Sequence, residues 1–110
     1  MAATPEAKIK ARVKAVLSRY QGVYYEMPVP SGYGNTTLDF IGCWRGRFFA
    51  IETKAGGKKP TPKQKSIMER MVAAGGAVFY INDDLMTIIS LVTWLNSLEP
   101  THDHPDIETK

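Results

Sequence analysis

The sequence predicts an α/β fold in which helices flank a mixed β-sheet. Segments with apolar residues at helical spacing alternate with short runs rich in β-branched and aromatic residues. Two of these runs are separated only by Arg45-Gly46, which is a suitable connection for an antiparallel hairpin. The next run follows after a helical segment long enough for a parallel crossover connection. Together these observations favour antiparallel and parallel pairing within one sheet.

The 110 residues are enough for one compact domain, which we expect over residues 1–98. A mobile acidic tail is expected over residues 99–110, which hold four acids and one base. The 13 bases and 7 acids that remain give residues 1–98 a net charge of +6, which suits a nucleic-acid partner. No run approaches the ~20 apolar residues of a membrane span, and no secretory signal is visible, so we expect a cytoplasmic protein without a membrane partner. The single Cys43 excludes an internal disulfide.

The first helix is predicted over residues 5–20. Thr4 is suited to be its N-cap, Pro5 occupies the first helical position, and Gly22 ends the helix. Glu6 lies on the apolar face of this helix. Considered alone, it is explained as a first-turn acid that the helix dipole favours.

The central part of the chain is predicted to supply three strands. A β-branched and aromatic run predicts the first over residues 23–27, and a loop with two glycines follows over residues 30–37. Residues 38–44 and 47–54 are the two strands of the hairpin.

A second helix is predicted over residues 61–74, where Thr61 and Gln64 form a capping box. A fourth strand is predicted over residues 77–81. The helix residues expected to face inward are Ile67, Met68, Met71 and Val72.

The end of the domain has two interpretations. Residues 86–89 are compatible with a short strand or with the start of a helix, and we favour a strand followed by a helix over residues 91–98. Trp44 and Trp94 are expected to be core or interface residues, and Cys43 a buried apolar residue.

The predicted hairpin register brings two acids together. Counting outward from Arg45-Gly46, Asp39 lies opposite Glu52, and two like charges there need a cation between them. Strand alternation puts Lys54 on the same face as Glu52. Hard cations such as Mg²⁺ bind one or two carboxylates together with waters and substrate phosphates, and a lysine beside them can orient water or offset charge. Without this register the same residues would be a surface Glu–Lys pair and an unrelated aspartate.

The order of these residues resembles a known family. Leu38-Asp39 followed by Ile51-Glu52-Thr53-Lys54 is similar to the signature of PD-(D/E)XK nucleases, although Leu38 stands where the name has proline. The fuller pattern, over residues 4–82, resembles the VRR-NUC branch of that superfamily. It comprises Glu6, Gly34, the hairpin residues Gly46-Arg47, and Gln64. The resemblance implies a restriction-endonuclease-like αβα core.

The resemblance also implies a site that binds Mg²⁺ or Mn²⁺. Its metal ligands would be Asp39, Glu52 and the backbone carbonyl of Thr53. Lys54 would be the catalytic lysine, and Glu6 would reach the metal directly or through water. Gln64 would orient Lys54 or the attacking water. The residues themselves agree on Gln64, because it shares the apolar face of its helix and points toward the sheet.

Lysines are concentrated after the proposed site, at Lys58, Lys59, Lys63 and Lys65. They suit contacts to DNA phosphates, although such a run is also typical of a solvated face. Tyr33 could stack on an unpaired base or be an exposed loop tyrosine. His102 and His104 lie in the acidic tail, where we expect no catalytic role.

The expected function is a metal-dependent DNA endonuclease. The resemblance to stand-alone members of the family implies a nuclease that resolves Holliday junctions in a bacterial or phage-infected host cell. Its products would carry 5′-phosphate ends. Symmetric cutting of branched DNA needs two sites related by a two-fold axis, so we expect a homodimer. Its interface is expected to be either the 91–98 helix or an apolar strand that contains tyrosine. The alternatives are a flap, single-strand or restriction-type nuclease of the same fold, and a non-catalytic DNA-binding module.

Overall fold

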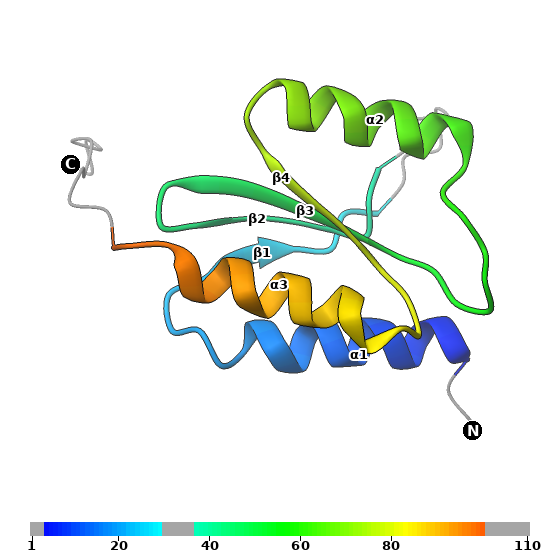
Figure 1. Ribbon diagram of the computed structural model, residues 1–110, viewed down its shortest axis with the longest axis horizontal. Helices are drawn as coiled ribbons and strands as arrows, with labels where there is room; N and C mark the ends of the chain where they lie inside the picture. The colour runs from blue at the N-terminus through cyan, green and yellow to red at the C-terminus, as the bar shows by residue number, and fades with distance from the viewer. Residues whose placement is uncertain (1–3, 30–36, 101–110) are drawn as a thin grey trace.

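The structure, a computed structural model, describes residues 4–29 and 37–100 and has an α/β fold (Figure 1). A four-stranded mixed sheet carries three helices, which confirms the predicted fold class. The elements in chain order are α1 (Pro5–Leu17), β1 (Tyr24–Glu26), β2 (Phe40–Trp44), β3 (Arg47–Thr53), α2 (Pro62–Ala73), β4 (Ala77–Ile81) and α3 (Leu85–Ser97). Within the described residues, no helix is long and apolar enough to cross a membrane.

The strands lie in the order β1-β2-β3-β4, so β1 and β4 form the two edges of the sheet. β1, β2 and β3 pair antiparallel, whereas β4 pairs parallel to β3 after the α2 connection. The predicted hairpin register is confirmed, since Phe40 pairs with Ile51. Both turn residues have positive φ angles, 48° at Arg45 and 83° at Gly46, as a type I′ turn requires.

The main core lies between the sheet and the helices α1 and α3, which cover the same face (Figure 1). Trp44 is buried there, and its Nε1 donates a hydrogen bond of 2.9 Å to the carbonyl of Leu95. Trp94 packs against the rings of Phe49 and Phe79. Trp44 is therefore a core residue, which was one of the two expected roles, and Trp94 is partly buried against the core. The largest fully buried apolar side chains of this core are Ile9, Leu17, Phe40, Phe49, Ile51, Ile81, Leu91 and Leu95.

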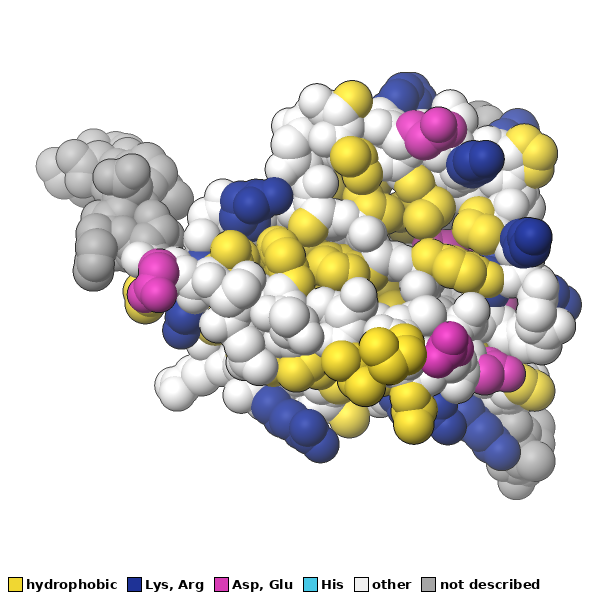
Figure 2. All heavy atoms as spheres, in the orientation of Figure 1, with side chains coloured by type: hydrophobic (Ala, Val, Ile, Leu, Met, Phe, Trp, Pro, Cys, Tyr) yellow, Lys and Arg dark blue, Asp and Glu magenta, His cyan; other side chains and the backbone are white. Residues whose placement is uncertain are grey.

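Helix α2 covers the opposite face and is packed less tightly. None of its residues is fully buried. The expectation that Val72 faces inward is wrong, because 57% of its surface is exposed. Val72 lies over β4, and no further strand extends the sheet beyond that edge within the described residues. Figure 2 shows hydrophobic side chains at the surface between α2 and β4.

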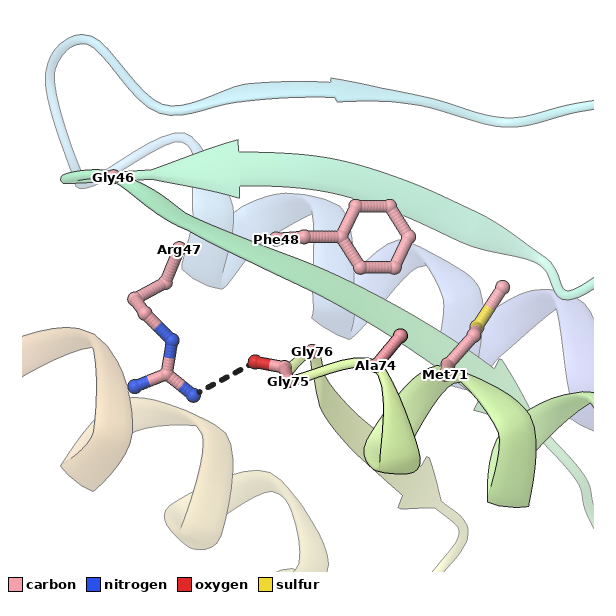
Figure 3. A pocket seen from close by; sticks show the side chains of 7 residues that line it. All are labelled: Gly46, Arg47, Phe48, Met71, Ala74, Gly75 and Gly76. Atoms are coloured by element: carbon pink, nitrogen blue, oxygen red, sulfur yellow. Dashed lines mark hydrogen bonds between the residues drawn. The ribbon is translucent and has the colours of Figure 1, made fainter.

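The C-terminal end of α2 is fixed against the hairpin (Figure 3). The guanidinium of Arg47 donates a hydrogen bond of 3.3 Å to the carbonyl of Gly75. The next residue, Gly76, passes so close to Phe48 that a Cβ atom there would lie 2.8 Å from the ring. This close approach requires glycine and brings the chain back to the sheet as β4.

Three further local predictions are wrong. Residues 86–89 are not a strand, because Asp84 caps one continuous helix by accepting a hydrogen bond of 3.0 Å from the N–H of Met86. The first helix ends at Leu17 rather than at residue 20. Cys43 is exposed rather than buried, because its side chain alternates away from the core face that buries Trp44, and α2 packs on β4 instead of on this part of β2.

Candidate active site

Two acidic residues meet where β2 begins and β3 ends. Asp39 directly precedes β2, and Glu52 is the penultimate residue of β3, with only 2% of its surface exposed. The backbone N–H of Asp39 donates a hydrogen bond of 3.2 Å to Glu52 Oε1. This bond joins the start of β2, which begins at Phe40 instead of at residue 38, to the buried acid of β3.

The Asp39 carboxylate is held in a fixed orientation by Thr53. Asp39 Oδ2 accepts hydrogen bonds from the backbone N–H of Thr53, at 2.9 Å, and from its hydroxyl, at 2.6 Å. Two donors on one oxygen leave little rotational freedom for the carboxylate. The other oxygen, Oδ1, lies 3.6 Å from the ammonium of Lys10 on α1.

The buried Glu52 carboxylate has a polar partner at each oxygen. Its Oε2 accepts a hydrogen bond of 2.8 Å from Gln64 Nε2 and lies 3.3 Å from the Lys54 ammonium. A buried charge is tolerated only when it is paired and hydrogen-bonded in this way. Within the described residues, no buried side-chain nitrogen or oxygen lacks a partner.

Burial raises the pKa of the Glu52 carboxyl above its ordinary value, and the nearby Asp39 charge raises the pKa further. The ion pair with Lys54 and the hydrogen bond from the Asp39 N–H act in the opposite direction. A cation bound at these carboxylates would offset both unfavourable contributions, namely the desolvated charge and the like-charge repulsion.

Gln64 performs both of the roles that the sequence suggested for it. Its Oε1 accepts a hydrogen bond of 3.0 Å from the N–H of Thr61, and the Thr61 hydroxyl accepts one of 3.2 Å from the N–H of Gln64. The amide nitrogen is then directed at Glu52. Reversing the amide would place donor against donor at Thr61, so the capping box fixes the orientation of the group that contacts the acid.

Glu6 is connected to this site through Lys10. Glu6 Oε2 lies 3.7 Å from the Lys10 ammonium, which also contacts Asp39. Across residues 4–29 and 37–100, no three acidic, histidine or cysteine side chains gather closely enough to hold a metal ion. Sequence reasoning missed Lys10, although its spacing of four residues from Glu6 puts both on one face of α1.

The predicted DNA-binding lysines are exposed near the same end of the sheet. Lys58 and Lys59 lie in the loop after β3, and Lys63 and Lys65 lie in the first turns of α2. Three positions considered in the sequence, Tyr33, His102 and His104, lie outside the described residues, as does residue 34.

The chain matches no family model and no curated protein. The donor set itself fits a hard divalent cation, which takes one or two carboxylates and completes its shell with water and substrate oxygens. The N–H and C=O of a strand residue point to the same side, so the Thr53 carbonyl faces the Asp39 side as its N–H does. A cation there would take the place of the Lys10 ammonium beside Asp39.

Proposed function

We propose that this chain is a divalent-metal-dependent DNA endonuclease with a restriction-endonuclease-like core of the VRR-NUC type. The observation that carries the proposal is the convergence of the Asp39 and Glu52 carboxylates, the Lys54 ammonium and the Gln64 amide at one end of the sheet. The sequence order of these four residues resembles that of the PD-(D/E)XK nucleases, and their contacts support that resemblance on physical grounds.

In this proposal Asp39, Glu52 and the carbonyl of Thr53 hold Mg²⁺ or Mn²⁺. The metal, when bound, supplies a Lewis acid that activates water and offsets charge on the phosphodiester. Thr53 keeps the Asp39 carboxylate in one orientation through its two hydrogen bonds. Gln64 does the same for Glu52.

Lys54 is proposed as the catalytic lysine. Its side chain is only 16% exposed and its ammonium lies 3.3 Å from Glu52 Oε2, so the ammonium is held at this carboxylate without being fully solvated. A cation in such a water-poor position stabilises charge that develops on a phosphate more strongly than an exposed lysine would. The exposed lysines Lys58, Lys59, Lys63 and Lys65 would contact the DNA backbone without reading its sequence.

The proposed substrate is branched DNA, resolved as a Holliday junction by a homodimer. Two cuts placed symmetrically on a four-way junction require two sites related by a two-fold axis. Helix α3 is the proposed interface, because its first turns expose three large hydrophobic side chains. These are Leu85, Met86 and Ile89.

The test is cleavage of labelled four-way junctions, flaps and linear duplexes by one preparation, with Mg²⁺, with Mn²⁺ and with a chelator. Glu52→Gln and Lys54→Met are expected to lower the cleavage rate by at least about a hundredfold, in the range of general acid–base and electrostatic contributions. Asp83→Asn removes an exposed acid outside the site and serves as the matched control. Folded wild-type protein that binds DNA but cleaves none of the three substrates would support a DNA-binding module instead.

A further inference from the structure

A groove that the proposed chemistry does not use lies between α2 and the edge strand β4. Its volume is about 660 Å³, within the range of sites that bind small organic groups. The lining is mostly apolar, with Met68 and Val72 from α2 and Val78 and Tyr80 from β4. Figure 2 shows the hydrophobic side chains that gather there.

The groove adjoins the candidate active site. Tyr80 pairs directly with Glu52 in the parallel register of β3 and β4, so both side chains project from the same face of the sheet, on strands about 4.8 Å apart. The Tyr80 hydroxyl also donates a hydrogen bond to the carbonyl of Lys58. The groove wall and the loop after β3 therefore adjoin the position of the buried acid.

The charges around the groove are distributed unevenly. Lys59 and Lys65 line the end that adjoins the loop after β3, with Lys58 and Lys63 nearby in the chain. The one acid among the described residues that line the groove, Glu69, lies a helical turn beyond Lys65. A phosphate would therefore be held at the Lys59 and Lys65 end, and an uncharged planar group along the apolar part.

A lysine-rimmed apolar groove with an accessible aromatic ring fits an unpaired nucleotide strand better than a duplex. Base faces stack on aromatic side chains only when they are released from the duplex stack, while lysines follow the phosphates. In paired DNA the same faces are covered by neighbouring base pairs, and the apolar lining would have nothing to contact.

We propose that this groove binds an unpaired DNA segment next to the phosphodiester that is cut. A base would lie against Tyr80 and Val72, with its phosphate at Lys59 and Lys65. The inference rests on the proposed function, because it places the reacting phosphate at Asp39 and Glu52. It also adds to the proposed function that at least one nucleotide at the branch point is unpaired when the DNA is bound.

The groove can be tested separately from the chemistry by measuring how the protein binds a short fluorescent oligothymidylate. Fluorescence anisotropy reports the binding, and a chelator prevents cleavage. Val72→Glu changes an exposed side chain and puts a carboxylate in the groove. The matched control, Ser66→Glu, adds the same charge at an exposed position of α2 outside the groove. We expect Val72→Glu to weaken binding about tenfold more than Ser66→Glu does, since one stacked base accounts for about that factor. Tyr80→Leu, checked for folding by circular dichroism, should weaken binding about tenfold.

Equal binding by Val72→Glu and Ser66→Glu would overturn the inference. It would also be overturned if Val72→Glu converted a dimer to a monomer without weakening oligothymidylate binding, because the groove would then be a contact between two copies. The outcome for the nuclease is separate. If the wild-type protein binds the oligonucleotide through the groove but cleaves no DNA with Mg²⁺ or Mn²⁺, the groove proposal is supported and the endonuclease proposal is contradicted. If both glutamate variants cleave a fork at equal rates, only the groove proposal is contradicted.

Discussion

Gln64 Nε2 donates a hydrogen bond of 2.8 Å to Glu52 Oε2, while Oε1 of the same amide accepts one from the N–H of Thr61. One side chain thus caps α2 and orients the buried acid of β3. The start of a helix and the geometry of the candidate site are therefore coupled through a single amide group.

Separate substitutions should distinguish these two roles. Thr61→Ala removes the cap and should lower the free energy of unfolding by about 1 kcal/mol while leaving DNA cleavage close to wild type. Gln64→Ala also removes a partner of the buried carboxylate, so it should cost about 1–3 kcal/mol and lower cleavage as well. Urea denaturation and the cleavage assay measure the two effects. If both variants lost activity equally, Gln64 would act only as a cap.

Lys10 should compete with a metal ion for Asp39. Its ammonium lies 3.6 Å from Asp39 Oδ1, and a cation bound there would have to displace it. Lys10→Met should therefore tighten Mn²⁺ binding several-fold, because one competing charge is removed. Lys8→Met removes an exposed charge from the same helix and is the control. Calorimetric titration that showed weaker or unchanged Mn²⁺ binding by Lys10→Met would contradict this role.

The stability of the metal-free protein should depend on the protonation of Glu52. Its pKa is raised in the folded state, so the native protein binds more protons than the unfolded chain between the two pKa values. The Glu52 contribution to the free energy of unfolding is fully present below the unfolded pKa, about 4.3, and is lost as pH rises through the folded pKa. The difference in that free energy between wild type and Glu52→Gln should therefore fall with rising pH, as measured in urea with a chelator. A difference that rose with pH would show that the pKa is lowered instead.

Much of the fold follows from local patterns in the sequence. Arg45-Gly46 determines the hairpin register, because a two-residue type I′ turn fits the right-handed twist of paired strands. That register predicts the proximity of Asp39 and Glu52 from the sequence alone. The capping box likewise predicted where α2 begins.

Other features depend on packing across the molecule. The apolar run at residues 86–89 suits a strand and a helix equally, and the Asp84 cap together with burial of Leu91 and Leu95 determines the outcome. Local pattern alone could not show that Lys10 reaches Asp39, because the two residues lie on separate elements. The exposure of Val72 results from the position of β4 at the sheet edge, which depends on the strand order of the whole sheet.

The proposed homodimer predicts a change in molecular mass. Met86 and Ile89 are exposed on α3, and lysines at both positions should oppose burial of this surface between two copies. The double variant Met86→Lys, Ile89→Lys should sediment as a monomer under conditions in which the wild type is a dimer. Ala11→Lys, at an exposed position of α1, should leave the dimer intact. A double variant that remained dimeric would place the interface elsewhere.

The most direct measurement is calorimetric titration of metal-free protein with Mn²⁺. The wild type and the control Asp83→Asn are predicted to bind the ion saturably, and Asp39→Asn is predicted not to bind it. The substituted amide would retain an oxygen that accepts the two hydrogen bonds from Thr53, so the loss of binding would reflect the missing charge rather than a lost fold. Absence of saturable binding by the wild type, or equal binding by Asp39→Asn, would contradict a metal site at these carboxylates.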